Sequence, residues 1–160
     1  LRGWREEGLE VARVAVNLSP RQFEDPGLLD GVRAVLAQAG LPSGSLELEI
    51  TESAALHDPE RAIALMSTLR ELGVALALDD FGTGYSNLSQ LKRLPVDVLK
   101  IDQMFVRQIV RDAGDAAIVR AVIALAHGFG LKVVAEGVEA QSQVIKLAQL
   151  DCDICQGYHY

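Results

Sequence analysis

An apolar run that ends in two adjacent carboxylates constrains the fold of this chain more than any other feature. The run spans residues 75–78, and Asp79 and Asp80 follow it. Apolar runs of this kind are typical of buried parallel strands, and catalytic groups lie where such strands end. Neighbouring side chains on a strand point in opposite directions, so both carboxylates can face one site only where the strand breaks. Gly82 and Gly84 stand in the next loop and allow that break, because glycine tolerates positive φ.

Two carboxylates held this close repel each other unless a proton or a cation lies between them. Hard divalent cations take oxygen ligands from clustered Asp and Glu, so the pair predicts a metal site. A solvated acidic turn is the alternative for this stretch alone. Residues 80–82 (Asp-Phe-Gly) also suggest a protein kinase, but kinases need a glycine-rich loop and a catalytic-loop aspartate followed by asparagine. Neither occurs upstream, so the kinase interpretation fails.

The length and charge of the chain limit its class. With 160 residues it can form one domain with a substantial core. Its 22 acidic and 15 basic residues give a formal net charge of -7, which argues against binding to duplex nucleic acid or to a membrane surface. A small anionic ligand remains compatible, because bound cations can reverse the local field. No apolar run approaches the ~18 residues of a membrane span and no secretory signal opens the chain. We therefore expect a cytoplasmic protein, or the cytoplasmic part of a membrane-bound sensor.

Strand patterns and helix patterns alternate along the chain. Short apolar or alternating segments predict strands over residues 13–17, 46–50, 75–79, 96–101, 132–136 and 153–156. Helical spacing between Gly and Pro breakers predicts helices over 28–39, 59–72, 88–94, 112–129 and 141–150, and the end of another over 1–10. Such alternation is typical of a parallel sheet with right-handed crossovers.

These six βα units favour a TIM-type β/α barrel, although an open parallel sheet is also compatible with the pattern. A complete eight-stranded barrel typically has ~250 residues, which is more than this chain provides. We therefore predict an incomplete barrel. Residues 1–160 would form a single domain that lacks its first strands and its last helix, and so is truncated at both ends.

The strand at 46–50 indicates how the two faces of the sheet differ. Its leucines and Ile50 alternate with Glu47 and Glu49. The apolar face would pack on helices, and the two carboxylates would point into the barrel. Carboxylates in an interior are costly without partners, so we expect each to find one.

Each predicted strand ends in a polar or charged side chain. The carboxyl ends of parallel strands lie at one edge of the sheet, so these side chains should converge. Turns are commonly polar, which explains one such ending but not all of them together. The converging residues are Asn17, Glu49, Asp79, Lys100, Glu136 and Gln156.

The oxygen donors in this set suit Mg²⁺ or Mn²⁺. Two such ions ~3.5–4 Å apart would activate water and hold both oxygens of an in-line phosphoryl displacement. Lys100 could hold or deprotonate the attacking water, or simply pair with a carboxylate. Gln156 could hold a substrate group or a metal-bound water. The candidate metal ligands are Asn17, Glu49, Asp79, Asp80 and Glu136.

Six ordered motifs cover nearly the whole chain. They occupy residues 16–19 (Val-Asn-Leu-Ser), 49–53 (Glu-Ile-Thr-Glu-Ser), 79–86 (Asp-Asp-Phe-Gly-Thr-Gly-Tyr-Ser), 99–102 (Leu-Lys-Ile-Asp), 135–139 (Ala-Glu-Gly-Val-Glu) and 156–158 (Gln-Gly-Tyr). These motifs resemble those of EAL domains, a family of cyclic-di-GMP phosphodiesterases. The resemblance implies a β/α barrel that opens cyclic di-GMP to the linear dinucleotide pGpG, using Mg²⁺ or Mn²⁺.

The resemblance also implies roles for individual residues. Lys100 matches the family's water-activating lysine, and Gln156 its glutamine near that water; with Glu136 they are the candidate catalytic residues. A first metal ion would be held by Asn17, Glu49 and Asp79, and a second by Asp79, Asp80 and Glu136. The residues that would support the loops or the substrate are Glu52, Asp102, Glu139, Gly82 and Gly84.

The sequence departs from the family pattern at its ends. The Glu-Ala-Leu signature, whose glutamate is a metal ligand, is absent, and so is the family's last helix. An EAL-like domain with a damaged metal site can bind cyclic di-GMP as a receptor, which is the alternative to an enzyme; an unrelated metal-dependent α/β enzyme is a third possibility. We expect the 160-residue chain alone to be inactive and to self-associate through unpaired strand edges.

In the family, the complete domain is expected to form a homodimer, and the parent chain can carry a sensor domain or a GGDEF-type diguanylate cyclase domain. The two cysteines, Cys152 and Cys155, have His159 nearby, but a structural zinc site needs four ligands and no second pair of cysteines is present. We predict two reduced, structural thiols.

Overall fold

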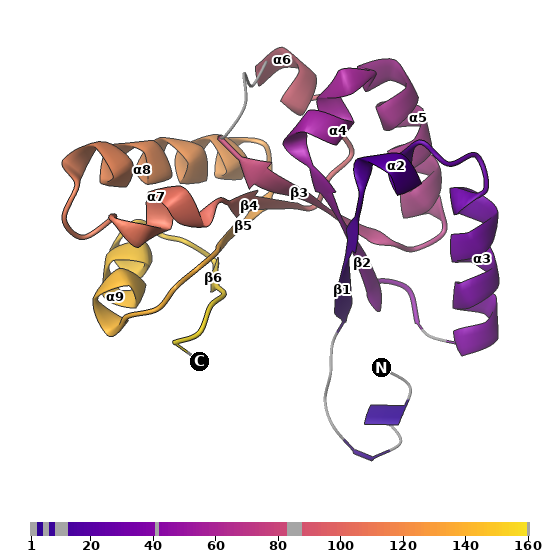
Figure 1. Cartoon of the computed structure of the whole chain (residues 1–160), viewed down its shortest axis with the longest axis horizontal. Coiled ribbons are helices and arrows are strands. Elements are labelled where there is room, and N and C mark those ends of the chain that lie inside the picture. The colour runs from indigo at the N-terminus through magenta and orange to yellow at the C-terminus, as the bar shows by residue number, and fades with distance from the viewer. Residues whose placement is uncertain (1–2, 5–6, 9–12, 41, 83–87, 160) are drawn as a thin grey trace.

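The centre of the structure is a sheet of six parallel strands that neighbour one another in chain order. The structure is a computed structural model, and it describes residues 3–4, 7–8, 13–40, 42–82 and 88–159. The sheet curls into a half-barrel, which confirms the predicted incomplete β/α barrel (Figure 1). The strands are β1 (Val14–Leu18), β2 (Leu46–Thr51), β3 (Ala75–Phe81), β4 (Val98–Ile101), β5 (Lys132–Ala135) and β6 (Ile154–Cys155).

Helices connect the strands and lie on the outer side of the curved sheet (Figure 1). Within the described part of the chain, none of them is both long enough and apolar enough to cross a membrane. The described helices are α2 (Pro20–Phe23), α3 (Leu28–Ala39), α4 (Glu52–His57), α5 (Pro59–Glu71), α6 (Leu88–Leu91), α7 (Gln103–Arg107), α8 (Ala113–Gly128) and α9 (Gln141–Gln149).

Alternation along the strands gives the sheet two different faces. Leu48 and Ile50 of β2 are buried in the main core under the helices. Glu47 and Glu49 lie on the opposite, inner face, as their alternation predicts, because successive side chains on a strand point to opposite sides. The inner face also carries a small apolar cluster formed by Ala77, Val98 and Val134.

Three short helices, α2, α4 and α7, lie in segments to which the sequence analysis assigned no helix or strand. They have four to six residues, too few to show helical periodicity in the sequence. The side chains that cap their first turns are Ser19, Thr51 and Asp102. Helix α6 ends at Leu91 and not at residue 94 as predicted. The predicted helix over residues 1–10 lies largely outside the described residues.

Strands β1 and β6 form the two edges of the described sheet. Val16 on β1 is 44% exposed and Ile154 on β6 is 46% exposed, whereas Leu99 on the central strand β4 is fully buried. Edge strands present unpaired backbone N–H and C=O groups on one side, which is the basis of the predicted self-association.

Both cysteines are free thiols that pack against the main core. Burial raises the pKa of the Cys152 thiol to about 11, so this group stays protonated near neutral pH. The Cys152 Sγ–H donates to the backbone carbonyls of Ile154 and Val133. These contacts support the prediction of structural thiols, because a nucleophile or a metal ligand must be a thiolate.

Asp153 ties helix α8 to the start of strand β5. Its Oδ2 accepts a hydrogen bond from the Val133 N–H at 2.8 Å and lies 2.8 Å from Nε2 of His127 near the end of α8. Burial acts to raise the pKa of Asp153, but the hydrogen bonds from His127 and Val133 outweigh it and hold the pKa below its ordinary value. Folding therefore favours the ionised carboxylate.

We expect Asp153→Asn to lower the free energy of unfolding at pH 7 by about 1 kcal/mol, because it removes a charged acceptor of two hydrogen bonds. A carboxylate whose pKa is depressed by folding contributes stability at pH values above its pKa in the unfolded chain. The difference in the free energy of unfolding between wild type and variant should therefore shrink as the pH falls below about 4. Urea unfolding at several pH values measures it. The exposed Asp151→Asn serves as the control; equal effects of the two substitutions at pH 7 would contradict the assigned role.

Candidate active site

The buried ammonium group of Lys100 lies at the centre of the site. Its Nζ is 2.5 Å from Glu136 Oε1, 2.9 Å from Glu49 Oε1 and 3.5 Å from Asp79 Oδ1, and its side chain is only 3% exposed. Burial acts to lower the pKa of Lys100, but hydrogen bonds to Glu136 and Glu49 outweigh it and raise the pKa above its ordinary value. The lysine is therefore a cation held by three carboxylates, two from strands β2 and β3 and one from the residue that follows β5.

Strand β3 breaks where its two carboxylates stand, as predicted. Asp80 has a positive φ of 56°, and its N–H donates to Asp79 Oδ1 at 2.9 Å. The pairing of β3 with β4 shifts register between Leu78 and Phe81. A left-handed residue changes the direction of the chain, and aspartate tolerates this conformation better than most residues. The break lets both side chains approach the same site.

Asp79, Asp80 and Glu136 form a group that could hold a cation. One carboxylate oxygen of each lies within 4.8 Å of the others. Burial raises the pKa of Asp80 above its ordinary value, and the charges of Asp79 and Asp102 raise it further. Burial likewise raises the pKa of Glu136, although Lys100 acts in the opposite direction. Clustered oxygen donors with excess negative charge fit a hard divalent cation.

Glu52 supports the loop that follows β3. It is the first residue of α4 and is buried, and its Oε2 accepts a hydrogen bond from the Gly82 N–H at 3.1 Å. Gly82 has φ 98°, and a Cβ at this position would lie 2.9 Å from a ring carbon of Phe105. Only glycine fits this conformation and this close approach. Gly84, the other predicted loop glycine, lies outside the described residues.

The remaining predicted site residues make none of the ion pairs that surround Lys100 in the described part of the chain. Asn17 is exposed on edge strand β1 and pairs in register with Glu49. Gln156 is exposed after β6 and lines the same groove as Lys100. Asp102 caps α7 by accepting from the Met104 N–H at 2.6 Å.

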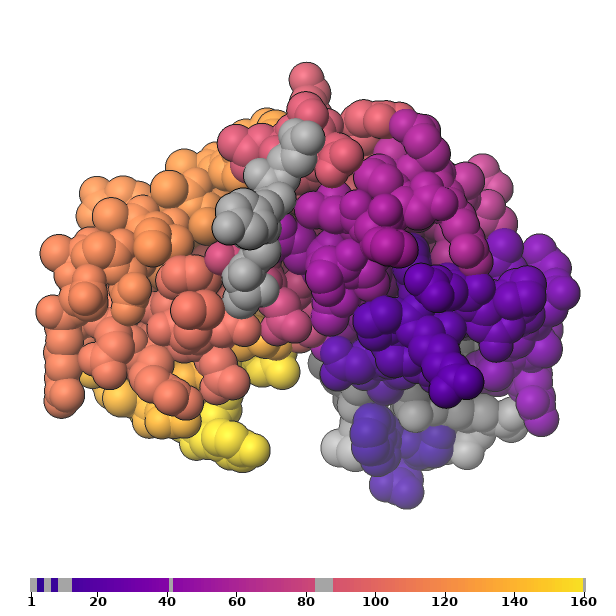
Figure 2. All heavy atoms as spheres, turned by 45° about the horizontal axis from the view of Figure 1, so that its top comes forward, coloured from indigo at the N-terminus to yellow at the C-terminus, as the bar shows by residue number. Residues whose placement is uncertain are grey.

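A groove of about 1040 Å³ runs along the inner face of the half-barrel. Figure 2 shows it as the hollow under the arch, between the yellow C-terminal residues and the opposite half of the molecule. Glu49 and Lys100 line it near the strand ends, and Glu47 lines it deeper, where Arg13 Nη1 pairs with Glu47 Oε2. Both inward carboxylates of β2 thus have a cationic partner, which meets the expectation from the sequence.

Sequence reasoning missed two side chains at this site. Arg13 stands 34 residues from Glu47, and no local pattern links them. Gln143 is a buried residue of α9 that faces the end of α7, and its side chain accepts hydrogen bonds from the N–H groups of Glu139 and Ala140. These bonds fix the backbone of Glu139, a predicted loop-supporting residue that is itself exposed. A glutamine at the third position of a predicted helix is a signal for such a capping contact.

The chain belongs to the EAL domain family, whose model matches residues 1–160. The cyclic di-GMP phosphodiesterase NbdA of Pseudomonas aeruginosa is 47% identical over 158 residues, which cover 99% of this chain and 20% of NbdA. The bifunctional diguanylate cyclase/cyclic di-GMP phosphodiesterase MucR of the same organism is 44% identical over 158 residues, covering 99% of this chain and 23% of MucR.

The solved structures agree with the sequence comparison. The structure of the PaMucR phosphodiesterase in complex with c-di-GMP superposes with a TM-score of 0.94 at 44% identity, over 99% of this chain and 64% of that chain. The present chain spans less than a quarter of the length of NbdA and of MucR.

We expect divalent cations to raise the melting temperature, because in their absence the carboxylates of Asp79, Asp80 and Glu136 repel one another. A ligand that binds only the native state stabilises it by ~2.7 kcal/mol at a hundred times its dissociation constant. Melting followed by circular dichroism in EDTA and in millimolar Mn²⁺ measures the shift.

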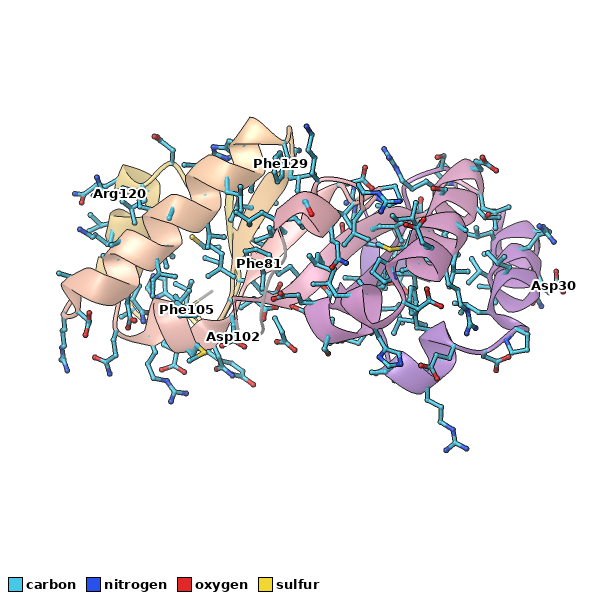
Figure 3. The ribbon with its side chains drawn as sticks, turned by 90° about the horizontal axis from the view of Figure 1, so that it is seen from above. Asp30, Phe81, Asp102, Phe105, Arg120 and Phe129 are labelled. Atoms are coloured by element: carbon cyan, nitrogen blue, oxygen red, sulfur yellow. The ribbon has the colours of Figure 1, made fainter. Side chains whose placement is uncertain are left out.

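The matched variants for this measurement are Asp80→Asn, which should reduce the Mn²⁺-dependent shift, and Asp30→Asn, which should not. Asp30 lies on α3 at the far end of the molecule (Figure 3). A melting temperature that is the same in EDTA and in Mn²⁺ would count against a metal site.

Proposed function

We propose that this chain is the catalytic part of a metal-dependent phosphodiesterase that hydrolyses cyclic di-GMP to linear pGpG. The observation that carries the proposal is the contact of Lys100 with Glu49 of β2, Asp79 of β3 and Glu136 directly after β5, beside the acidic group formed by Asp79, Asp80 and Glu136. This arrangement stands in a chain of the EAL domain family. NbdA and MucR, which are relatives of this chain, are named as cyclic di-GMP phosphodiesterases.

The donor set suits two Mg²⁺ or Mn²⁺ ions. Asn17, Glu49 and Asp79 would hold the first ion, and Asp79, Asp80 and Glu136 the second. All are oxygen donors, as these hard cations prefer. When bound, such ions lower the pKa of a coordinated water and neutralise charge on phosphate oxygens.

The reaction adds water to one phosphodiester. The water oxygen bonds to phosphorus, the bond from phosphorus to the 3′ oxygen breaks, and that oxygen receives a proton. Lys100, as a cation surrounded by carboxylates, is suited to orient the water and to stabilise developing negative charge. Of the roles predicted for Lys100, the contacts show the pairing with carboxylates, and the raised pKa argues against a lysine that deprotonates the water; holding the water is the role that we propose. Glu136 would accept a proton, and Gln156 would hold a substrate group or the water.

The remaining predicted residues would position loops. Glu52 would steady the loop after β3 through Gly82, and Gly84, which lies outside the described residues, stays a proposed loop-supporting residue. Asp102 would keep α7 in place beside Asp80, and Glu139 would support the loop after β5. The binding partner we propose is cyclic di-GMP, in a cytoplasmic protein that acts as a homodimer and carries a sensor or GGDEF-type domain elsewhere in its chain. The double activity in the name of MucR supports the last point.

The test is turnover by the parent protein that contains this chain. We expect cyclic di-GMP and Mn²⁺ to yield pGpG, measured by chromatography, and EDTA to abolish the reaction. Binding of cyclic di-GMP without any product would contradict the enzyme and assign the receptor function instead.

We expect Lys100→Met to lower the turnover rate by ~10²-fold or more, since it removes the cation that would stabilise negative charge on the reacting phosphate. The melting temperature in Mn²⁺ reports whether the variant is folded, because removal of one member of a buried ion pair is also destabilising. Lys92→Met, at an exposed lysine that also lines the groove but is not among the described ion-pair partners of the three carboxylates, is the control. Turnover by folded Lys100→Met at the wild-type rate would contradict the role of Lys100.

A further inference from the structure

We propose that Gln143 is a positioning residue that clamps the loop after β5 to helix α7, and that α7 in turn supports the loop after β3. The clamp would set the distance between Glu136 on one side and Asp79 and Asp80 on the other. The inference rests on the proposed function, because it assigns Gln143 to the geometry of the same metal-binding group.

Gln143 uses both ends of its amide. Its Oε1 accepts from the N–H groups of Glu139 at 2.8 Å and Ala140 at 2.9 Å, at the start of α9. Its Nε2 donates to the carbonyls of Val106 at 3.1 Å and Arg107 at 3.4 Å, at the end of α7. The side chain is buried, so a lost partner would leave a buried polar group unsatisfied.

The two ends have different consequences. The contacts of Oε1 are those of an ordinary capping residue and would stabilise α9 by themselves. The contacts of Nε2 reach a helix 36 and 37 residues earlier in the chain. The last carbonyls of a helix have no partner within it, so α7 gains external donors there. The position of the loop after β5 is thus linked to that of α7.

The start of α7 packs against the same loop. Gly137 directly follows Glu136 and has φ 67°. A Cβ at Gly137 would lie 2.5 Å from the Cβ of Gln103, the first residue of α7. This close approach requires glycine, and it leaves the backbone next to Glu136 little freedom to move relative to α7.

Helix α7 also packs against Gly82, the residue that follows β3. A Cβ on Gly82 would lie 2.9 Å from a ring carbon of Phe105, and the Gly82 N–H donates to Glu52. Figure 3 shows Phe105 and Asp102 beside Phe81, the last residue of β3. One short helix therefore lies between the loops that follow β3 and β5, and Gln143 fastens it to the second of them.

The first experiment measures hydrogen exchange in the full chain with Gln143→Glu. This change keeps the Oε1 acceptor and removes the Nε2 donor. We expect exchange to rise about tenfold over residues 136–140 and also over 79–82, because the clamp joins both loops. Gln149→Glu, at an exposed glutamine on the same helix, should leave both segments unchanged. Should Gln143→Glu fail to fold, Gln143→Ala replaces it. Unchanged exchange over 79–82 would overturn the clamp and leave Gln143 as a helix cap only.

The second experiment measures Mn²⁺ binding by the loss of the free-ion EPR signal. Substitution of residues that orient metal ligands typically weakens metal binding 10–100-fold, so we expect the dissociation constant to rise about tenfold in Gln143→Glu and not in Gln149→Glu. Equal affinities of the two variants would overturn the positioning role. Absence of Mn²⁺ binding by the wild type would overturn the proposed function, whereas the exchange experiment tests the clamp without any metal.

Discussion

The structure depends on the compensation of a buried ammonium group by three carboxylates. Lys100 reaches Glu49, Asp79 and Glu136, so β4 is joined electrostatically to β2, to β3 and to the residue after β5. Burial of an unpaired ion costs several kcal/mol, and removal of one partner leaves another charge uncompensated. The charges of the site therefore compensate one another only in the strand order and register that bring these strand ends together.

The same constraint extends along the inner face of the half-barrel. The outer face is apolar and packs under helices, so burial of hydrocarbon stabilises it. The inner face carries Glu47 as well as Glu49, and Arg13 supplies the charge that Glu47 needs. A groove lined by paired charges suits an anionic ligand that arrives with cations, in spite of the net charge of -7.

Short segments after the strands give the site its detailed shape. Helix α4 begins with Glu52, which holds Gly82, and helix α7 packs against both Gly82 and Gly137. Such contacts have a geometric cause: where two backbones approach closely, only glycine fits. Packing and backbone hydrogen bonds next to Asp79, Asp80 and Glu136 thus hold these carboxylates close together, against the mutual repulsion of their charges.

The sequence by itself determined the strands, their two faces and the break after Leu78. These features follow from periodicity and from local residue types, which act over a few neighbouring positions; Asp79, Asp80 and the alternation of β2 are examples. Its ordered motifs also determined the family.

Only the tertiary structure decided which distant groups meet. Arg13 pairs with Glu47, Asp153 with Val133, and Gln143 with Val106, across separations of 34, 20 and 37 residues. The short helices α2, α4 and α7 belong here too, because so few residues show no period of their own. Contacts of this kind depend on strand register and side-chain reach in the folded chain, and neither is encoded in any local pattern.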